Sequence, residues 1–139
     1  MTFDLFLCFN GDCIAALEFY TSVFMLKMPE HVMTYGQAPG YSGSEADKNR
    51  IIYANLPIFG CNVMFSDCLT GSEYMKGTNI ILTLGTNDAE DIKRIFVALS
   101  DGGTVDMEME KTFFSELYGM VTDKFGIKWQ LTLTPFEQK

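Results

Sequence analysis

The order of strand-like and helix-like segments repeats in this sequence, and the repeat restricts the fold more than any other feature. Residues 3–9 form a short apolar run typical of a strand, and the stretch from Cys13 to Phe24 then places apolar side chains at helical spacing. Strand patterns follow in residues 30–36 and 50–67, and the second of these is typical of a hairpin. The first half is therefore predicted to be βαβββ.

The second half has the same order of segments. Residues 78–84 predict a strand, and the helix after them has Asn87 and Glu90 at capping-box positions and stops at Gly102 and Gly103. Three more strand patterns complete the half, in residues 104–110, 114–123 and 127–133.

Two halves of about sixty residues each are expected to bury their apolar faces against each other. The fold class is α+β, with two βαβββ modules at about residues 3–67 and 78–134 inside one domain of 139 residues. Two such modules are expected to form a curved mixed sheet with a cleft, where a ligand binds.

Charge excludes several classes of partner. Eighteen acidic and ten basic residues give a net charge of -8 without any Lys/Arg cluster, so nucleic acid and anionic membranes are repelled. No apolar run is long enough for a membrane span, and the N-terminus lacks the basic start of a signal peptide. A cytoplasmic protein is expected.

The four cysteines fit that location. Cys8, Cys13, Cys61 and Cys68 are spaced like neither a zinc knuckle nor a CxxC redox pair. Buried, reduced thiols are the expected state.

Four segments resemble the PhnB-like branch of the vicinal oxygen chelate superfamily, the glyoxalase, bleomycin-resistance and dioxygenase group. The segments are residues 9–24, 54–67, 102–114 and 118–131, the last reading "YGMVTDKFGIKWQL". The resemblance runs from Phe3 to about Leu133. It implies the paired βαβββ fold (the glyoxalase/bleomycin resistance/dioxygenase fold) and, commonly, a homodimer.

Relatives in this branch are often described as demethylubiquinone methyltransferase domains. Methyl transfer needs a cradle for an adenosyl cofactor, and no glycine-rich loop follows a predicted strand here. The sequence therefore does not predict that activity.

The resemblance implies a divalent metal held by four side chains, usually His and Glu, from the first and last strands of each half. The matching positions are Leu5, Met64, Asn79 (or Ile81) and Gln130. None is ionisable, and amide oxygens suit calcium better than iron, zinc or nickel. No metal and no cofactor are therefore expected.

Two further positions differ from the branch. Tyr53 stands where relatives often have His, and Phe114 stands where Trp is common. A phenol still donates a hydrogen bond into a pocket. His31 is the single histidine, and it is expected at the surface rather than in catalysis.

The candidate ligand-binding residues are Tyr53, Asn79, Phe114, Trp129 and Gln130, and no catalytic residue is identified. Trp129 alternates in phase with Leu131, which favours a place in the core. The polar candidates suit recognition more than proton transfer, because none titrates near neutral pH.

Asp67 and Asp123 end the two halves at matching places. A carboxylate beside a turn is most often a cap that holds the loop, so a structural role is expected for both.

Three functions stay open. The first is a metal-free module that binds a small organic molecule in a mainly apolar cleft. The second is a metal-dependent lyase or dioxygenase with relocated ligands, drawn from Glu108, Glu110 or Glu116 together with His31. The third is a protein that binds a macromolecular partner through an exposed apolar patch.

Overall fold

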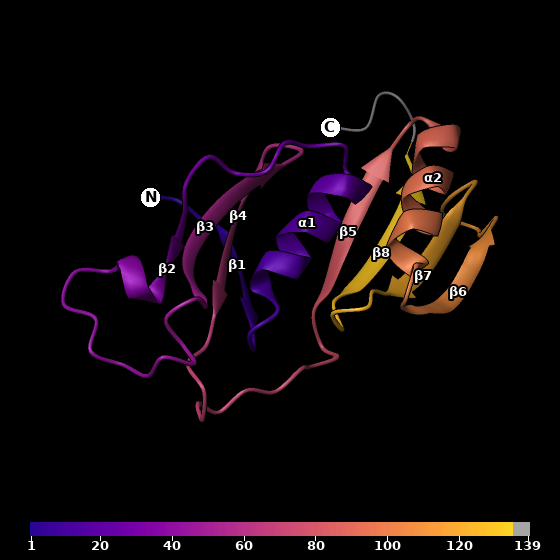
Figure 1. Cartoon of the computed structure of the whole chain (residues 1–139). Coiled ribbons are helices and arrows are strands. Elements are labelled where there is room, and N and C mark those ends of the chain that lie inside the picture. Colours follow the sequence, from indigo (N-terminus) through magenta and orange to yellow (C-terminus); the bar gives the residue numbers. More distant parts are fainter. Residues whose placement is uncertain (135–139) are drawn as a thin grey trace. The chain divides into compact units, whose positions relative to one another are not determined.

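The computed structural model describes residues 1–134 of the chain. The chain divides into two compact units, with the boundary between Tyr74 and Met75. Each unit contains one four-stranded sheet and one α-helix packed on it (Figure 1).

Unit 1 has strands in the order β1-β4-β3-β2, with β1 parallel to β4 and the other pairs antiparallel. Its elements are β1 (Leu5–Phe9), α1 (Cys13–Val23), β2 (Val32–Thr34), the 3₁₀ helix η1 (Tyr35–Gln37), β3 (Ile51–Ile58) and β4 (Cys61–Asp67).

Unit 2 repeats this topology as β5-β8-β7-β6, again with the outer pair β5 and β8 parallel. Its elements are β5 (Ile81–Thr86), α2 (Ala89–Ser100), β6 (Thr104–Glu110), β7 (Tyr118–Thr122) and β8 (Lys128–Leu133). The α+β class and the two βαβββ halves are thus confirmed, as two four-stranded mixed sheets. The grouping of all 139 residues into one domain stays a prediction.

Helix α2 begins one residue later than the capping box suggested. Its N-cap is Asp88, whose Oδ1 accepts from the backbone N–H of Glu90 at 3.0 Å and of Asp91 at 3.1 Å. The expectation for Asn87 was wrong because Asn87 stands one position ahead of the cap, where its side chain does not face the free N–H groups of the first turn.

Three expected strands are shorter than their sequence patterns. Strand β5 begins at Ile81, where pairing with Lys128 starts, and β2 ends where η1 begins at Tyr35. The pattern from 114 to 123 shortens to β7 because Thr112 and Ser115 close a turn before it, with the Thr112 N–H donating to the Ser115 carbonyl at 2.8 Å.

One face of each sheet is covered by its own helix. In unit 1 the buried strand residues alternate in sequence and pack with α1, and they include Leu7, Phe9, Ala54, Leu56, Val63 and Phe65. In unit 2, Val121, Trp129 and Leu131 are buried with Ile92, Ile95, Phe96 and Leu99 of α2. The expected core position of Trp129 is confirmed.

The opposite side of each sheet is referred to below as the helix-free face of that unit. Side chains alternate along a strand, so the residues between the buried ones lie on this face. They include Phe6, Tyr53, Asn55 and Met64 in unit 1 and Thr83, Tyr118, Met120 and Gln130 in unit 2. Over residues 1–134, neither α1 nor α2 is both long and apolar enough to cross a membrane.

Candidate ligand-binding faces

Asn55 lies among apolar side chains on the helix-free face of unit 1. Its cross-strand partner on β4 is Met64, and the next residue across the sheet, on β1, is Phe6. Tyr53 stands two residues before Asn55 and pairs with Met33 of β2. The side chains of Phe6, Tyr53 and Met33 are 52%, 45% and 43% exposed, so this part of the face presents apolar surface.

The Oδ1 atom of Asn55 is buried and has no hydrogen-bond partner among the described residues. Almost all buried polar atoms in folded proteins are paired, and an unpaired one costs about 1–3 kcal/mol. A carbonyl oxygen only accepts, so the group that completes this site must carry an N–H or an O–H.

Gln130 occupies the corresponding face of unit 2, and two strands hold its amide. The Tyr118 hydroxyl on β7 donates to Gln130 Oε1, and Gln130 Nε2 donates to Thr83 Oγ1 on β5 at 2.7 Å. The ring of Phe114 packs edge-on against Tyr118, with 4.9 Å between ring centroids. One N–H and one oxygen lone pair of Gln130 remain for a ligand.

Charges near Gln130 are paired with each other. The Thr122 hydroxyl donates to Asp106 at 2.6 Å, and Lys128 Nζ lies 3.1 Å from Thr122 Oγ1 and 3.6 Å from Asp106. A ligand at this part of the face therefore meets paired charges of opposite sign and no patch of one sign.

The metal positions expected from the resemblance need one correction. Leu5 shares its side of β1 with the buried Leu7 and Phe9, so it lies on the face covered by α1. The β1 residue that faces the same way as Met64 is Phe6, its partner in the ladder. The assignment of Leu5 was wrong because a shift of one residue along a strand reverses the face.

In unit 2 the position on the helix-free face is Ile81 rather than Asn79. Ile81 opens β5 and is separated by one residue from Thr83, the partner of Gln130, whereas Asn79 precedes the strand. The four positions are thus Phe6, Met64, Ile81 and Gln130. They offer a phenyl ring, a thioether, an aliphatic chain and an amide whose oxygen and nitrogen each already make one hydrogen bond. Divalent transition metals need imidazole, carboxylate or thiolate donors, so these residues do not fit such an ion.

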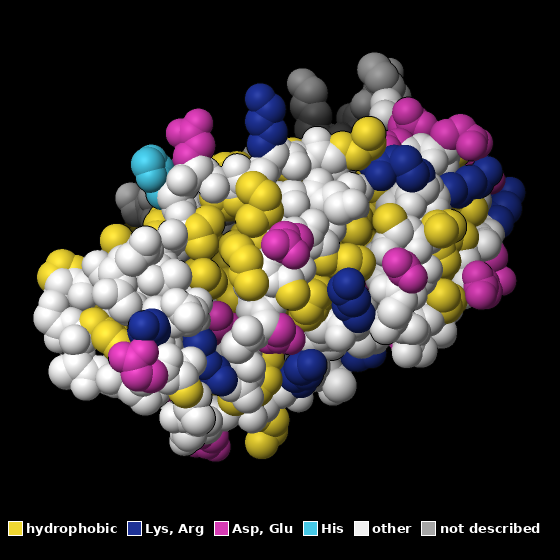
Figure 2. Space-filling view, in the orientation of Figure 1, with side chains coloured by type: hydrophobic (Ala, Val, Ile, Leu, Met, Phe, Trp, Pro, Cys, Tyr) yellow, Lys and Arg dark blue, Asp and Glu magenta, His cyan; other side chains and the backbone are white. Residues whose placement is uncertain are grey.

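The relocated metal ligands do not gather either. Across residues 1–134, no three or more His, Cys, Asp or Glu side chains lie close enough together to hold a metal ion. Glu108 and Glu110 are exposed on β6, and exposed Glu116 pairs with Lys111 at 3.3 Å. His31 is exposed just before β2, and the one histidine stands out from the surface in Figure 2.

Asp67 ties three segments of unit 1 together. Its side chain is buried, and Oδ1 accepts from the backbone N–H of Gly11 at 2.7 Å and of Cys13 at 3.1 Å. Oδ2 accepts from the N–H of Ile51 at 2.9 Å. The carboxylate therefore caps the first turn of α1 and holds the start of β3.

Asp123 holds the turn between β7 and β8 in unit 2. Its Oδ1 accepts from the N–H of Phe125 at 2.9 Å and of Ile127 at 3.1 Å, and its Oδ2 accepts from Trp129 Nε1 at 2.9 Å. Both carboxylates therefore accept hydrogen bonds that hold local structure, as expected for the two aspartates.

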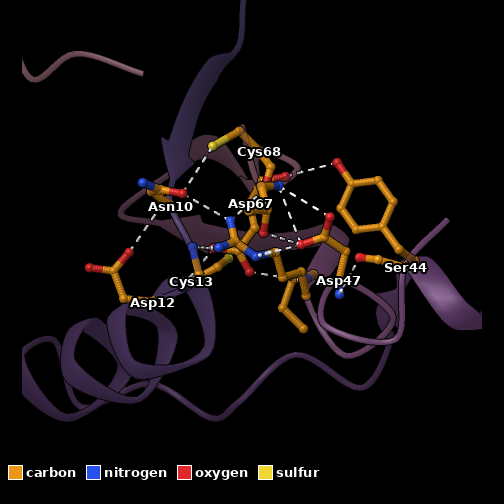
Figure 3. A network of polar contacts seen from close by, with 12 residues as sticks. Asn10, Asp12, Cys13, Ser44, Asp47, Asp67 and Cys68 are labelled. Atoms are coloured by element: carbon orange, nitrogen blue, oxygen red, sulfur yellow. Dashed lines mark hydrogen bonds and ion pairs between the residues drawn. The ribbon is translucent and has the colours of Figure 1, made fainter. Parts of the chain in front are cut away.

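The segment of residues 36–49, which leads from η1 to β3, is anchored at its end. Asp47 is buried and accepts from the Thr70 hydroxyl at 2.5 Å, while Arg50 Nε lies 3.1 Å from Asp47 Oδ1 (Figure 3). Hydrogen bonds from Thr70 and the charge of Arg50 hold the pKa of Asp47 below its usual range.

The five sequence candidates are thus placed differently. Tyr53 lies beside Asn55 on the helix-free face of unit 1, and Phe114 reaches Gln130 through Tyr118 in unit 2. Asn79 is exposed outside the sheet. Trp129 is buried on the face covered by α2 and bonded to Asp123, so a ligand on the helix-free face does not reach it.

Sequence reasoning missed Asn55 and Tyr118. Asn55 is the one amide in the apolar run "IIYANLPI", in phase with Tyr53, and this signal was available from the alternation alone. The role of Tyr118 depends on its register with β8, which is not visible in the sequence.

Two four-stranded mixed sheets, each with one helix in a βαβββ order, define the glyoxalase/bleomycin resistance fold of the vicinal oxygen chelate superfamily. Residues 2–132 match the family described as 3-demethylubiquinone-9 3-methyltransferase, and the chain belongs to that family.

Relatives cover nearly the whole chain. Protein YjdN of Escherichia coli is 27% identical over 96% of this chain and 95% of its own. The crystal structure of PA1353 from Pseudomonas aeruginosa has a TM-score of 0.85 and 27% identity, covering 96% of this chain and 97% of that one. The PhnB protein from Bacillus cereus, a putative 3-demethylubiquinone-9 3-methyltransferase, has a TM-score of 0.80 and 25% identity, covering 96% and 100%.

A more distant structure shares the fold alone. The fosfomycin resistance protein FosX from Listeria monocytogenes has a TM-score of 0.63 and 12% identity, covering 99% of this chain and 95% of that one. A variant of FosX was solved with Mn(II) and 1S,2S-dihydroxypropylphosphonic acid, so a member of this fold binds a small ligand.

Proposed function

We propose that this protein binds a small organic molecule, without a metal, on the helix-free face of unit 1. The observation that carries the proposal is the buried, unpaired Oδ1 of Asn55 among Met64, Phe6 and Tyr53. The ligand class is a flat, mainly apolar molecule with an N–H or O–H, such as a phenol or an indole.

The expected affinity is modest. Burying about 100 Å² of apolar surface gains about 2.5 kcal/mol, and pairing the Asn55 oxygen gains about 1–3 kcal/mol. These terms correspond to a Kd of roughly 0.1–3 mM for a ligand of one or two rings.

Gln130 and Phe114 are proposed as ligand contacts on the helix-free face of unit 2. The hydrogen bonds from Tyr118 and to Thr83 orient the amide, which leaves its second N–H available. An oriented amide supports recognition of a carbonyl or hydroxyl group.

The family description names a methyl transfer, and we propose that this chain does not perform it. The turn after β1, Asn10-Gly11-Asp12, holds a single glycine, and its N–H donates to Asp67. The turn after β5 contains Asn87 and Asp88 and no glycine. Neither turn fits the glycine-rich cradle of a nucleotide-like cofactor.

A fragment titration of the full chain followed by NMR tests the proposal, with phenol and indole as probes. We expect saturable shifts for residues around Asn55, and at least a tenfold loss of affinity in Asn55→Leu, since about 1.4 kcal/mol is a tenfold change. Asn49→Leu is the matched control, because Asn49 is exposed in the 36–49 loop. Equal affinity in both variants contradicts the proposal.

Two parallel titrations address the other activities. Nickel, zinc, manganese and iron(II) are each added to the apo protein and followed by calorimetry, and S-adenosylmethionine is tested in the same way. Stoichiometric, tight metal binding favours a lyase or dioxygenase with relocated ligands. Binding of S-adenosylmethionine favours the activity in the family description.

A cytoplasmic homodimer is proposed as the working state, supported by the resemblance to the PhnB-like branch. Light scattering on the purified chain tests the dimer, for which the expected mass is twice 15.6 kDa.

A further inference from the structure

Two cysteines meet at the end of β1 in unit 1. Cys8 pairs with Ser66, and Cys68 follows directly after β4, which ends at Asp67. Phe9 and Asp67 point toward α1, so alternation turns Cys8 and Cys68 toward the helix-free face. Both are free thiols, but the expectation of burial was wrong for them, because Cys8 is exposed and Cys68 partly exposed.

The two residues converge on one carbonyl group. The Phe9 oxygen accepts the backbone N–H of Cys68 at 2.7 Å and the Cys8 thiol at 3.9 Å. The Cys68 thiol lies 3.5 Å from Asn10 Oδ1 (Figure 3). To meet the Cys8 sulfur, the Cys68 side chain has to leave this contact.

We propose that Cys8 and Cys68 form a regulatory disulfide when the protein meets a low-molecular-weight disulfide such as glutathione disulfide. One protein thiolate attacks a sulfur of glutathione disulfide and releases glutathione thiolate. The second protein thiolate then attacks the mixed disulfide and releases a second glutathione. The protein loses two electrons and two protons, and the glutathione disulfide gains them.

Closing the bridge requires a small backbone movement. Strands lie about 4.8 Å apart and rise about 3.3 Å per residue, so residues offset by two positions on neighbouring strands lie about 8 Å apart at Cα. Disulfides span about 4.4–6.8 Å at Cα, so one residue must shift by about 1–4 Å. Cys68 is the residue that shifts, because it lies beyond the end of β4.

That movement is coupled to the 36–49 loop. The Cys68 carbonyl accepts from Arg50 Nη1 at 2.7 Å, the same Nη1 donates to Asn10 Oδ1 at 2.9 Å, and Arg50 Nε contacts Asp47 at 3.1 Å. Displacing Cys68 weakens the hydrogen bond from Arg50 to the Cys68 carbonyl. Arg50 is then held less firmly, and its ion pair with Asp47 weakens as well. The oxidised protein therefore holds the 36–49 loop less tightly.

The other two cysteines supply an internal comparison. Cys13 is buried at the start of α1, and burial raises the pKa of its thiol. Cys61 is exposed at the opposite end of β4, about 20 Å from Cys68 along the strand. Burial, with Cys68 and Asp67 nearby, also raises the pKa of Cys8, so exchange at Cys8 is expected to accelerate as the pH rises.

The test incubates the reduced full chain with reduced and oxidised glutathione at set ratios and then counts thiols under denaturing conditions. The wild-type count is expected to fall from four thiols to two, with a Cys8–Cys68 linked peptide in a digest and no bound glutathione. Cys61→Ser is expected to lose two thiols in the same way. The single variants Cys8→Ser and Cys68→Ser are expected to form no linked peptide. If a serine variant does not fold, the corresponding alanine variant, Cys8→Ala or Cys68→Ala, takes its place.

Hydrogen exchange of residues 36–49 supplies a second readout. The exchange rate is expected to rise about tenfold or more on oxidation of the wild type and of Cys61→Ser, and to stay constant in Cys8→Ala. A stable glutathione adduct in place of the linked peptide, or a linked peptide that contains Cys13 or Cys61, overturns the proposal. An unchanged exchange rate in the bridged protein overturns the coupling to the loop.

Discussion

At the scale of single residues, Asn55 holds a buried polar atom without a hydrogen-bond partner in residues 1–134. This Oδ1 lies beside Met64, its cross-strand partner, and Phe6 is the next residue across the sheet. A buried acceptor of this kind calls for an explanation, and a bound ligand is the one proposed above.

Replacing Asn55 by Leu is expected to stabilise the free protein while it removes ligand binding. Asn and Leu have similar volumes, and the unpaired oxygen costs about 1–3 kcal/mol, so the free energy of unfolding should rise by about 1 kcal/mol. Urea unfolding measures the change, with Asn49→Leu as control. A clear loss of stability in Asn55→Leu would show that the oxygen is paired in solution.

Asp123 is the opposite case, a buried carboxylate with all of its partners present. Asp123→Asn keeps one acceptor oxygen and sets its NH₂ group either against the N–H groups of Phe125 and Ile127 or against Trp129 Nε1, so we expect a loss of about 2–4 kcal/mol. Trp129 is the single tryptophan, and its fluorescence follows the change directly.

Asp101→Asn is the matched control, because Asp101 is exposed at the C-cap of α2. Equal unfolding midpoints for Asp123→Asn and Asp101→Asn would be inconsistent with a structural role of the buried carboxylate. A structural role for Asp67 and Asp123 was foreseeable from the sequence, but the expectation of matching places was wrong: Asp67 ends β4, the last strand of unit 1, whereas Asp123 lies in the turn before β8.

At the scale of elements, the two helices begin in different ways. Helix α2 carries its own cap in Asp88, whereas the N-cap residue of α1, Asp12, makes no side-chain cap bond. The first turn of α1 instead receives the carboxylate of Asp67 from the end of β4. Local sequence therefore suffices for the start of α2, and the start of α1 depends on the sheet.

Asp88→Ala is expected to lower the free energy of unfolding by about 1 kcal/mol, because two backbone N–H groups lose their acceptor. Asn87→Ala distinguishes the observed N-cap, Asp88, from the N-cap expected from the sequence, Asn87, because it removes only the latter. We expect that variant to change stability by less than about 0.5 kcal/mol. Thermal unfolding that shows the larger loss in Asn87→Ala would reverse the assignment.

The 36–49 loop is expected to loosen in acid. Hydrogen bonds from Thr70, with the charge of Arg50, lower the pKa of Asp47 in the folded state. A carboxyl with a lowered folded pKa contributes fully above its unfolded pKa of about 3.9 and loses that contribution as the pH falls through the folded value. Limited proteolysis of the loop should therefore accelerate below about pH 4.

Asp47→Asn removes the titrating group from the loop anchor. The variant is expected to be cleaved faster than wild type at pH 7 and to show no further acceleration of loop cleavage in acid. Glu45→Gln is the control, since Glu45 is exposed and bonds only with Lys48 among the described contacts. A wild-type loop whose cleavage is unaffected between pH 6 and the unfolding transition would contradict the role of Asp47.

At the scale of the whole molecule, the two units share one strand order but carry different polar side chains on their helix-free faces. Each unit holds one buried structural aspartate, Asp67 at the end of β4 and Asp123 in the turn between β7 and β8, and leaves one sheet face without a helix. The four positions taken from the resemblance as metal positions, once placed on the helix-free faces, hold Phe6, Met64, Ile81 and Gln130, and none of these side chains supplies an ionised donor.

Metal removal is therefore expected to leave the whole protein unchanged. Dialysis of freshly purified protein against a chelator should shift the thermal midpoint by less than about 1 °C, because no folding energy comes from a bound ion. Differential scanning calorimetry before and after dialysis measures this. A large drop, restored by one particular metal, would return attention to Glu108, Glu110 and Glu116.

The sequence by itself determined the order of elements and the face on which most side chains lie. Periods of two and 3.6 are local properties, so the βαβββ order, the buried phase of Trp129 and Leu131, and the α+β class followed from neighbouring residues alone. The errors were shifts of one or two residues near the starts of elements, at Leu5, at Asn79, for which Ile81 was the stated alternative, and at Asn87.

Only the tertiary structure decided which polar groups are paired. Gln130 bonds with Thr83, 47 positions away in the sequence, and with Tyr118, 12 positions away. Asn55 Oδ1, by contrast, has no hydrogen-bond donor among the described residues. Hydrogen-bond partners are chosen by the register between strands that are distant in the chain, and no local period encodes that register.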